Sequence, residues 1–480
     1  MDESLYMLCG EKLAAGATLY NEIWVQEPPL LMWFYGLFSW LFGRQALLMI
    51  RIFTCFYVYF IGVYLGALLV EYRMAGRYKF LSPVLTIFLL SVPWFAQELS
   101  AELFMLFPLI VAFYIFVEMS ERKKENYLSL MWAGFLLTLC LLVSFQAFFL
   151  FLAGMLLFLA IRGTAFDELI VFIGGGAMSL GLVVLALYYR GNLTMFKDLV
   201  LLYSIDSFWS GELGAYEGFG YRFLRSLVFW GGFLGLAILG FFHFRIRFFS
   251  YVKDLRLVET AMAFWLMGAV LCILFVGRGL DLHHLALLAI PVSFYTNHML
   301  TVMIRKNWQY MLLAIAIVLP IYAYWGFFQA VRKDSYSYAA YQREKVLFGD
   351  VLRSFRSSSE IVDYFSKKDV SNGIWIMAHR PDLYYLLDAD CSNKYIDFRI
   401  SWHKFESFPY RQENLLVSNT EYDDMIYEEF IAHTPDYIVD PHGYFSYLQD
   451  RFPTVFDQYD ADTLKDYMIY KRGGEELADK

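Results

Sequence analysis

The chain has 480 residues, of which 59% are hydrophobic, 20% aromatic and only 18% charged, and its formal net charge is −8. A composition this apolar excludes a protein that is a soluble globule throughout and predicts an integral membrane protein. The sequence has no polybasic tract, so we expect no nucleic-acid partner, and its five cysteines are too scattered for a disulfide framework or a cysteine metal site.

The first segment, residues 1–44, is predicted to be an acidic extracytoplasmic loop with amphipathic helices. Asp2 and Glu3 precede an apolar stripe between Leu5 and Leu13, and the helical spacing of this stripe places it on one face that can lie on the membrane surface. Taken alone, Asp2 is typical of a helix N-cap, because its carboxylate accepts hydrogen bonds from free N–H groups of the first turn.

Apolar runs of about the length needed to cross a bilayer fill residues 45–330. We count ten of them, near 45–70, 80–96, 101–118, 127–143, 146–161, 168–188, 224–243, 259–276, 284–300 and 309–329. Lysine and arginine cluster in every second connection, and the positive-inside rule predicts that these connections are cytoplasmic. The other side is then predicted to hold 1–44, 97–100, 144–146, 189–223, 277–283 and the tail. We therefore expect an α-helical polytopic protein of the cytoplasmic membrane.

Residues 331–480 are predicted to form a soluble extracytoplasmic α/β domain. Ser357 to Glu360 resemble a capping box before a helix, and the segments GIWIMA, DYIVD and DYMIYK are typical of strands. Alternating helices and strands favour an α/β unit. The four histidines of this domain are widely spaced, as ordinary surface histidines are, and we find no catalytic motif in it.

Two glutamates mark the start of the third predicted span. Glu98 and Glu102 are four residues apart and therefore share one helical face, an arrangement that is unfavourable near lipid. We expect Glu102 to contact a polar substrate or a cation. The alternative is that Glu98 lies in solvent and that Glu102 takes a proton or a hydroxyl partner.

A cationic group precedes the ninth predicted span, at Arg278, His283 and His284. Arginine offers a planar fork of donors and histidine can transfer a proton near neutral pH, so these residues suit a phosphate. The alternative is that Arg278 reaches lipid headgroups and the histidines are only interfacial. Neighbouring helical residues point in different directions, so we expect at most one histidine to face a site.

Acids and cations on the same outer side favour one chemistry. A carboxylate can deprotonate a hydroxyl acceptor while cations stabilise the charge on a departing phosphate. This combination predicts glycosyl transfer from a lipid-linked sugar.

The first segment also resembles a known family. Asp2-Glu3, Gly16, Tyr20 and the run from Glu27 to Leu30 resemble the membrane glycosyltransferases of the C-type fold, in particular bacterial aminoarabinose transferases and protein O-mannosyltransferases. The resemblance implies an inverting enzyme at the outer face of the cytoplasmic membrane. Its expected donor is a polyprenyl-phosphate sugar, and its expected acceptor is a hydroxyl of a lipid, glycan or protein.

The resemblance also implies roles for individual residues. Asp2 matches the family's catalytic acidic position, Glu3 its neighbour and Glu102 the second acidic position, whereas Arg278 and His283 fall where the family has groups near the donor phosphate. Further residues expected in the substrate cavity are Tyr20, Glu27 and Glu98.

Two departures from the family pattern are visible. Family members usually begin with a transmembrane helix before the acidic pair, so either this helix is lost here or an in-frame apolar segment precedes Met1. Ten spans with both ends outside favour the second alternative, because one more helix restores the usual cytoplasmic N-terminus. Relatives often carry a lysine directly before Pro-Pro, where this chain has Glu27; the phosphate role then shifts to Arg278, Lys12 or Arg222.

Two other functions are alternatives to glycosyl transfer. A transporter predicts internal repeats and spans broken by glycine or proline, and only the run from Gly174 to Gly176 and Pro291 fit that pattern. A noncatalytic scaffold or receptor leaves the outer acids without a shared purpose. The acids can hold a divalent cation, but no ligand spacing is specific enough to predict a metal site or a cofactor.

Overall fold

The computed structural model describes most of the N-terminal 303 residues and short pieces of the tail. The described backbone comprises 2–25, 27–71, 81–91, 99–122, 126–162, 166–202, 219–275, 282–303 and pieces between 361 and 473. The chain divides into two compact units: Met1–Gln26, Met32–Gly43 and Ser337–Lys480 form the first, and Glu27–Leu31 and Arg44–Tyr336 form the second. Each unit is described by itself.

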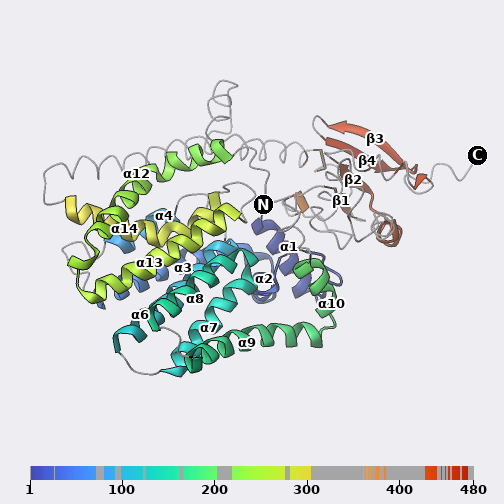
Figure 1. Ribbon diagram of the computed structural model, residues 1–480. Coiled ribbons are helices and arrows are strands. Elements are labelled where there is room, and N and C mark those ends of the chain that lie inside the picture. The colour runs from blue at the N-terminus through green and yellow to red at the C-terminus, as the bar shows by residue number, and fades with distance from the viewer. Residues whose placement is uncertain are drawn as a thin grey trace, which may run out of the picture. The chain divides into compact units, whose positions relative to one another are not determined.

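The second unit is a bundle of apolar helices (Figure 1). They are α3 (Ala46–Glu71), α4 (Leu81–Leu90), α6 (Ala101–Arg122), α7 (Tyr127–Val143), α8 (Phe148–Arg162), α9 (Phe166–Tyr189), α12 (Phe219–Ile246), α13 (Lys253–Phe275) and α14 (Ala289–Met303). Shorter turns are η1 (Gly43–Gln45), η2 (Phe145–Ala147), α10 (Leu193–Phe196), η3 (Lys197–Leu202), η5 (Phe248–Ser250) and η6 (Leu282–Leu288). Within the described residues, 5 helices are long and apolar enough to cross a membrane. The predicted polytopic α-helical fold is confirmed; the predicted run at 309–329 lies outside the described residues.

Glycines allow neighbouring helices of this bundle to approach closely. A Cβ atom on Gly134 of α7 would collide with the Phe172 carbonyl of α9, and one on Gly175 would collide with the Met131 carbonyl of α7. Small residues at such contacts are typical of membrane helix pairs. The glycine run of α9 therefore serves packing within an unbroken helix, and it does not mark the broken span that a transporter would need.

Pro108 leaves one backbone carbonyl of α6 without its usual donor. A proline has no N–H group, so the carbonyl four residues earlier, that of Phe104, loses its helical hydrogen bond. The hydroxyl of Tyr57 on α3 donates to this carbonyl at 2.6 Å. Membrane helices tolerate proline when a neighbouring helix supplies the missing partner, and Tyr57 does so here.

Pro291 is the third residue of α14, in the first turn, where N–H groups have no intrahelical partner and a proline is tolerated. The carbonyl four residues earlier belongs to Leu287, and the indole N–H of Trp265 on α13 donates to it at 2.9 Å. The chain changes from the 3₁₀ geometry of η6 to the α geometry of α14 at this point. Trp265 is fully buried against Phe113, with 5.1 Å between ring centroids, so the donor is held in place.

The N-terminal helices α1 (Asp2–Ala14) and α2 (Pro29–Phe42) pack against each other in the first unit. A Cβ atom on Gly10 would lie 2.8 Å from the Tyr35 backbone, and the Tyr6 and Tyr35 rings are 5.5 Å apart. Every residue from Leu5 to Gly10 is buried. Burial of α1 is thus wider than the single apolar stripe expected from its sequence.

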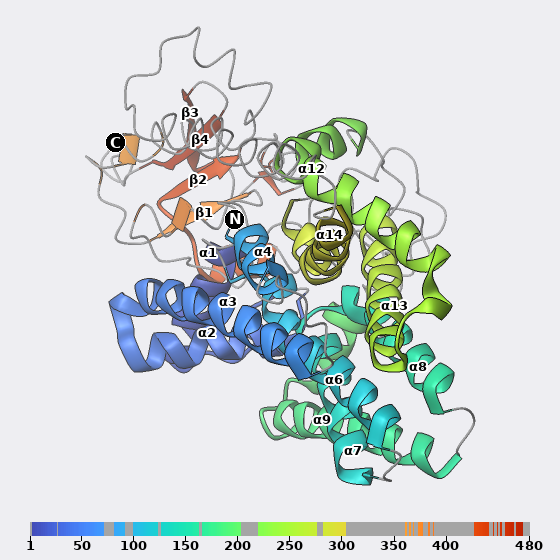
Figure 2. The ribbon, with the colours of Figure 1, turned by 90° about the vertical axis from the view of Figure 1, so that its left-hand side faces the viewer.

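The tail contains a four-stranded sheet with the order β1-β2-β4-β3 (Figures 1 and 2). Its strands are β1 (Ile374–Ile376), β2 (Tyr437–Asp440), β3 (Tyr459–Leu464) and β4 (Tyr467–Arg472). β1 and β2 are parallel, whereas β4 pairs antiparallel with both β2 and β3. The three predicted strands are confirmed, and β3 was not predicted. The small soluble α/β domain is therefore confirmed.

The proline arrangement predicts a stability effect that depends on Pro108. Tyr57→Phe is expected to lower the free energy of unfolding by about 1–3 kcal/mol, because the Phe104 carbonyl loses its donor. Unfolding of the purified protein in detergent measures the change, and Tyr59→Phe, which removes a hydroxyl from an exposed side chain, is the control.

The same change in a Pro108→Ala background provides the decisive comparison. Alanine restores the N–H group that bonds the Phe104 carbonyl, so Tyr57→Phe is expected to cost clearly less there. An equal loss of stability in both backgrounds would contradict the assigned role of Tyr57.

Candidate active site

Glu102 lies in the first turn of α6, and Ser100 begins this helix. The Ser100 hydroxyl accepts a hydrogen bond from the Leu103 N–H at 3.2 Å, and the Ser100 carbonyl accepts one from the Phe104 N–H at 3.0 Å. Ser100 is therefore the N-cap. The positive end of the helix dipole stabilises a carboxylate at the position of Glu102.

Glu102 forms a buried pair with His284. The distance between His284 Nε2 and Glu102 Oε1 is 3.6 Å, and only 3% of His284 and 4% of Glu102 are exposed. A buried carboxylate is costly unless a positive or hydrogen-bonding group compensates it. His284 is such a group, and the sequence had led us to expect some partner for Glu102.

The 3₁₀ turn η6 sets the direction of His284. Seven residues form this turn, whereas 3₁₀ runs longer than three or four residues are uncommon. Three residues per turn place neighbouring side chains about 120° apart, so His283 and His284 cannot face the same way. The resemblance had favoured His283, whose side chain lies outside the described residues; His284 makes the described contact. The sequence signal that could have favoured His284 over His283 was its position directly before the apolar run that continues into α14.

The predicted acids and the lysine of the first segment lie on α1. Asp2 and Glu3 are its first two residues, and the structure describes their backbone but not their side chains. Lys12 is half-buried in the last turn. Asp2 is the first residue of α1 and so lies one position after the N-cap that the sequence predicted for it, where the helix dipole favours an acid. Its role as the catalytic acid stays a prediction.

Tyr20 has an unusual backbone conformation. It is fully buried and is the one residue other than glycine with a positive φ, 69°, in the described part of the chain. Its N–H donates to the Ile23 carbonyl at 2.8 Å, which closes a tight turn. Strained backbone conformations of this kind occur often at functional sites, so Tyr20 stays a candidate residue of the substrate cavity.

Glu22 in the same turn is an exposed acid with local partners. The hydroxyl and the N–H of Thr18 donate to Glu22 Oε2 at 2.7 and 2.6 Å. These hydrogen bonds lower the pKa of the Glu22 carboxyl below its ordinary value. Glu22 therefore stays charged and stabilises the turn.

The remaining predicted residues are only partly described. Glu27 is half-exposed and stands just before Pro28, and α2 begins at Pro29, a favoured first position for proline. Arg222 lies in α12 without a described side chain, and Glu98 and Arg278 lie outside the described residues. Because the predicted residues are divided between the two units, their convergence on one cavity stays a prediction.

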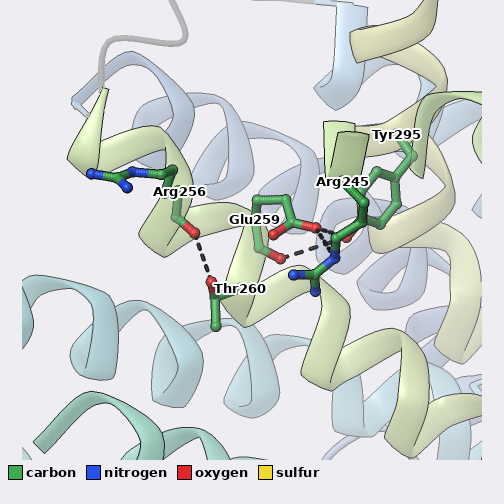
Figure 3. Close-up of polar contacts among 5 residues, drawn as sticks. All are labelled: Arg245, Arg256, Glu259, Thr260 and Tyr295. Carbon is green, nitrogen blue, oxygen red and sulfur yellow. Dashed lines mark hydrogen bonds and ion pairs between the residues drawn. The ribbon is translucent and has the colours of Figure 1, made fainter. Parts of the chain in front are cut away.

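A second buried polar cluster joins α12, α13 and α14 (Figure 3). The fully buried carboxylate of Glu259 lies 3.1 Å from Arg245 Nε and accepts a hydrogen bond of 3.1 Å from the Tyr295 hydroxyl. The rise of η6 and α14 places Tyr295 roughly 18 Å along the axis from His284, so this cluster is separate from the Glu102–His284 pair. The sequence prediction did not single out Glu259, although a lone acid in an apolar helix was a usable signal.

Neither cluster is a metal centre in the part of the chain that the structure describes. No group of three or more histidine, cysteine, aspartate or glutamate side chains there can hold a metal ion. The sequence predicts no metal site, and the side chains of Asp2 and Glu3 lie outside the described residues.

The comparisons with known proteins bear on the fold. No protein-family model and no curated protein matches the sequence. Among solved structures, the crystal structure of ArnT from Cupriavidus metallidurans in the apo state matches with a TM-score of 0.52 and 11% sequence identity. The match covers 98% of this chain and 92% of that chain. At this identity the likeness shows the fold alone: the chain has the fold of this ArnT structure, as the sequence resemblance implied.

Proposed function

We propose that this chain is an inverting membrane glycosyltransferase that transfers a sugar from a polyprenyl-phosphate donor to an acceptor hydroxyl. The observation that carries the proposal is the buried Glu102–His284 pair at the start of α6 in a chain with the ArnT fold. The acceptor is a lipid, a glycan or a protein. The reaction takes place at the outer face of the bacterial cytoplasmic membrane, on the same side as the C-terminal domain.

The proposed reaction is a single displacement at the anomeric carbon. The acceptor oxygen attacks from the face opposite the phosphate, the bond from carbon to the phosphate oxygen breaks, and the configuration inverts. Asp2 takes the proton of the acceptor as the general base, with Glu3 beside it. Glu102, oriented by His284, is the second acid and orients the reacting hydroxyl.

Cationic side chains bind the phosphate of the leaving group. Arg278 is the main candidate because its guanidinium offers a fork of donors, and the further candidates are His283, Lys12 and Arg222. Tyr20, Glu27 and Glu98 line the substrate cavity. Their charges act most strongly where the closed site excludes water.

Replacement of the proposed base tests the reaction directly. Asp2→Asn is expected to bind the donor and to lose sugar transfer by roughly a hundredfold to ten-thousandfold, because the amide cannot accept the proton. Transfer from a polyprenyl-phosphate sugar by the reconstituted protein measures the effect. Glu11→Gln, which neutralises an exposed acid on the same helix, is expected to keep full activity. Undiminished turnover of Asp2→Asn excludes this residue as the base.

The buried pair predicts coupled effects on turnover. Glu102→Gln is expected to lower kcat by about a hundredfold, and adding His284→Asn is expected to lower it little further, because the two residues act as one unit. Glu168→Gln is the matched control, since Glu168 is also a buried glutamate in the first turn of its helix. Independent, additive losses for Glu102 and His284 would argue against a functional pair.

The phosphate role of Arg278 is tested by donor binding. Arg278→Ala is expected to weaken binding of the polyprenyl-phosphate sugar by about tenfold or more, since hydrogen bonds to charged groups contribute about 1.5–3 kcal/mol. Arg190→Ala removes an exposed arginine at the end of α9 and is the control. Equal donor affinities for wild type and Arg278→Ala would remove Arg278 from the site.

A further inference from the structure

The turn between α12 and α13 exposes large apolar side chains. In this turn, residues 246–253, called here the α12–α13 hairpin, the exposed fraction is 84% for Ile246, 87% for Phe249 and 63% for Val252. Leaving such side chains in water is unfavourable by about 1.5–3 kcal/mol each relative to burial. The hairpin therefore needs an apolar environment outside the protein.

The exposed side chains continue the lipid-facing stripe of α12. Ile238 and Phe242 are 56% and 59% exposed, and with Ile246 they recur every four residues on one helical face. Another face of α12 packs on α14, where the Thr296 hydroxyl donates to the Phe233 carbonyl at 3.0 Å. Phe249 extends the exposed apolar stripe beyond the end of α12 at Ile246.

The hairpin has a fixed shape. The Phe248 ring lies between two guanidinium groups, 5.6 Å from that of Arg245 and 5.8 Å from that of Arg256. The Tyr251 ring stacks on Phe244 with 4.3 Å between centroids. Arg245 is in turn held by Glu259, whose carboxylate also binds Tyr295 (Figure 3). Little conformational freedom remains to be lost when the hairpin binds a partner.

Cations accompany the exposed apolar groups. Arg247 and Lys253 are exposed, and the described residues offer no acidic ion-pair partner to either of them. The single acid in residues 245–256 is Asp254. Long cationic side chains next to inserted apolar ones suit a surface of anionic lipid headgroups.

We propose that the α12–α13 hairpin is an interfacial anchor that binds an anionic phospholipid. Ile246, Phe249 and Val252 enter the boundary between headgroups and acyl chains, and Arg247 and Lys253 bind the headgroup phosphate. The hairpin belongs to a basic connection that the positive-inside rule assigns to the cytoplasmic side, so the ligand lies in the cytoplasmic leaflet. This inference is independent of the proposed glycosyl transfer.

Lipid binding to the purified full-length chain tests the charges. Native mass spectrometry with phosphatidylglycerol as the probe compares wild type with Arg247→Gln, Lys253→Gln and the double variant. Affinity is expected to fall about fivefold for each cation removed and to fall as salt is raised. Arg190→Gln, at the end of α9, is the matched control and is expected to bind as wild type does. Unchanged affinity in the double variant, or equal affinity for phosphatidylcholine, would overturn the proposal.

A fluorescent label at the hairpin tests the insertion. Phe249→Cys is labelled in a background in which Cys55 and Cys391 are serine, because Cys9, Cys140 and Cys272 are buried. In phosphatidylglycerol vesicles the label is expected to be quenched by headgroup-level nitroxide lipids and protected from aqueous iodide. Ready quenching by iodide would show that the hairpin stands in water, and it would overturn the anchor even where the charge variants bind less lipid.

Discussion

The bundle depends on side-chain donors that reach backbone carbonyls across helix contacts. Pro108 removes the donor of the Phe104 carbonyl, and Tyr57 of α3 replaces it at 2.6 Å; Trp265 of α13 donates to the Leu287 carbonyl in η6 at 2.9 Å. The hydrocarbon core of a bilayer contains no water that can donate to such a carbonyl, so the donor must come from a neighbouring helix. These two hydrogen bonds tie α6 to α3 and the turn η6 to α13.

These two ties hold the helices that carry the candidate site. Glu102 lies less than two turns before Pro108 on α6, and His284 lies in η6, directly before α14. The distance of 3.6 Å between the two side chains therefore rests on helix starts that are fixed by Ser100, Tyr57 and Trp265. A buried carboxylate held in this way needs no reorganisation before it acts, and electrostatic catalysis in a dry site requires such preorganisation.

The sequence was sufficient to predict the membrane class, most helices and three of the four strands, because hydrophobic runs of bilayer length and β-branched or aromatic segments reflect burial directly. Residues that contact across the fold were harder to predict. Glu102 was singled out because an acid at a membrane edge is conspicuous, whereas its contact with His284 was not predicted, since the two residues are far apart in the sequence. The donors Tyr57 and Trp265 were not predicted, since nothing in the sequence near them shows that a backbone carbonyl on another element accepts their hydrogen bond. Glu259 was not predicted because Arg245, which compensates its charge, lies on another helix.

The most direct test of the central claim is to identify the reaction product that the protein forms in a bilayer. Purified protein reconstituted into vesicles with a polyprenyl-phosphate sugar and an extract of envelope acceptors is expected to release polyprenyl phosphate in step with sugar transfer. Mass spectrometry and nuclear magnetic resonance of the product are expected to show an inverted anomeric configuration. Movement of a solute across the vesicle membrane without release of polyprenyl phosphate would contradict the account and would favour a transporter.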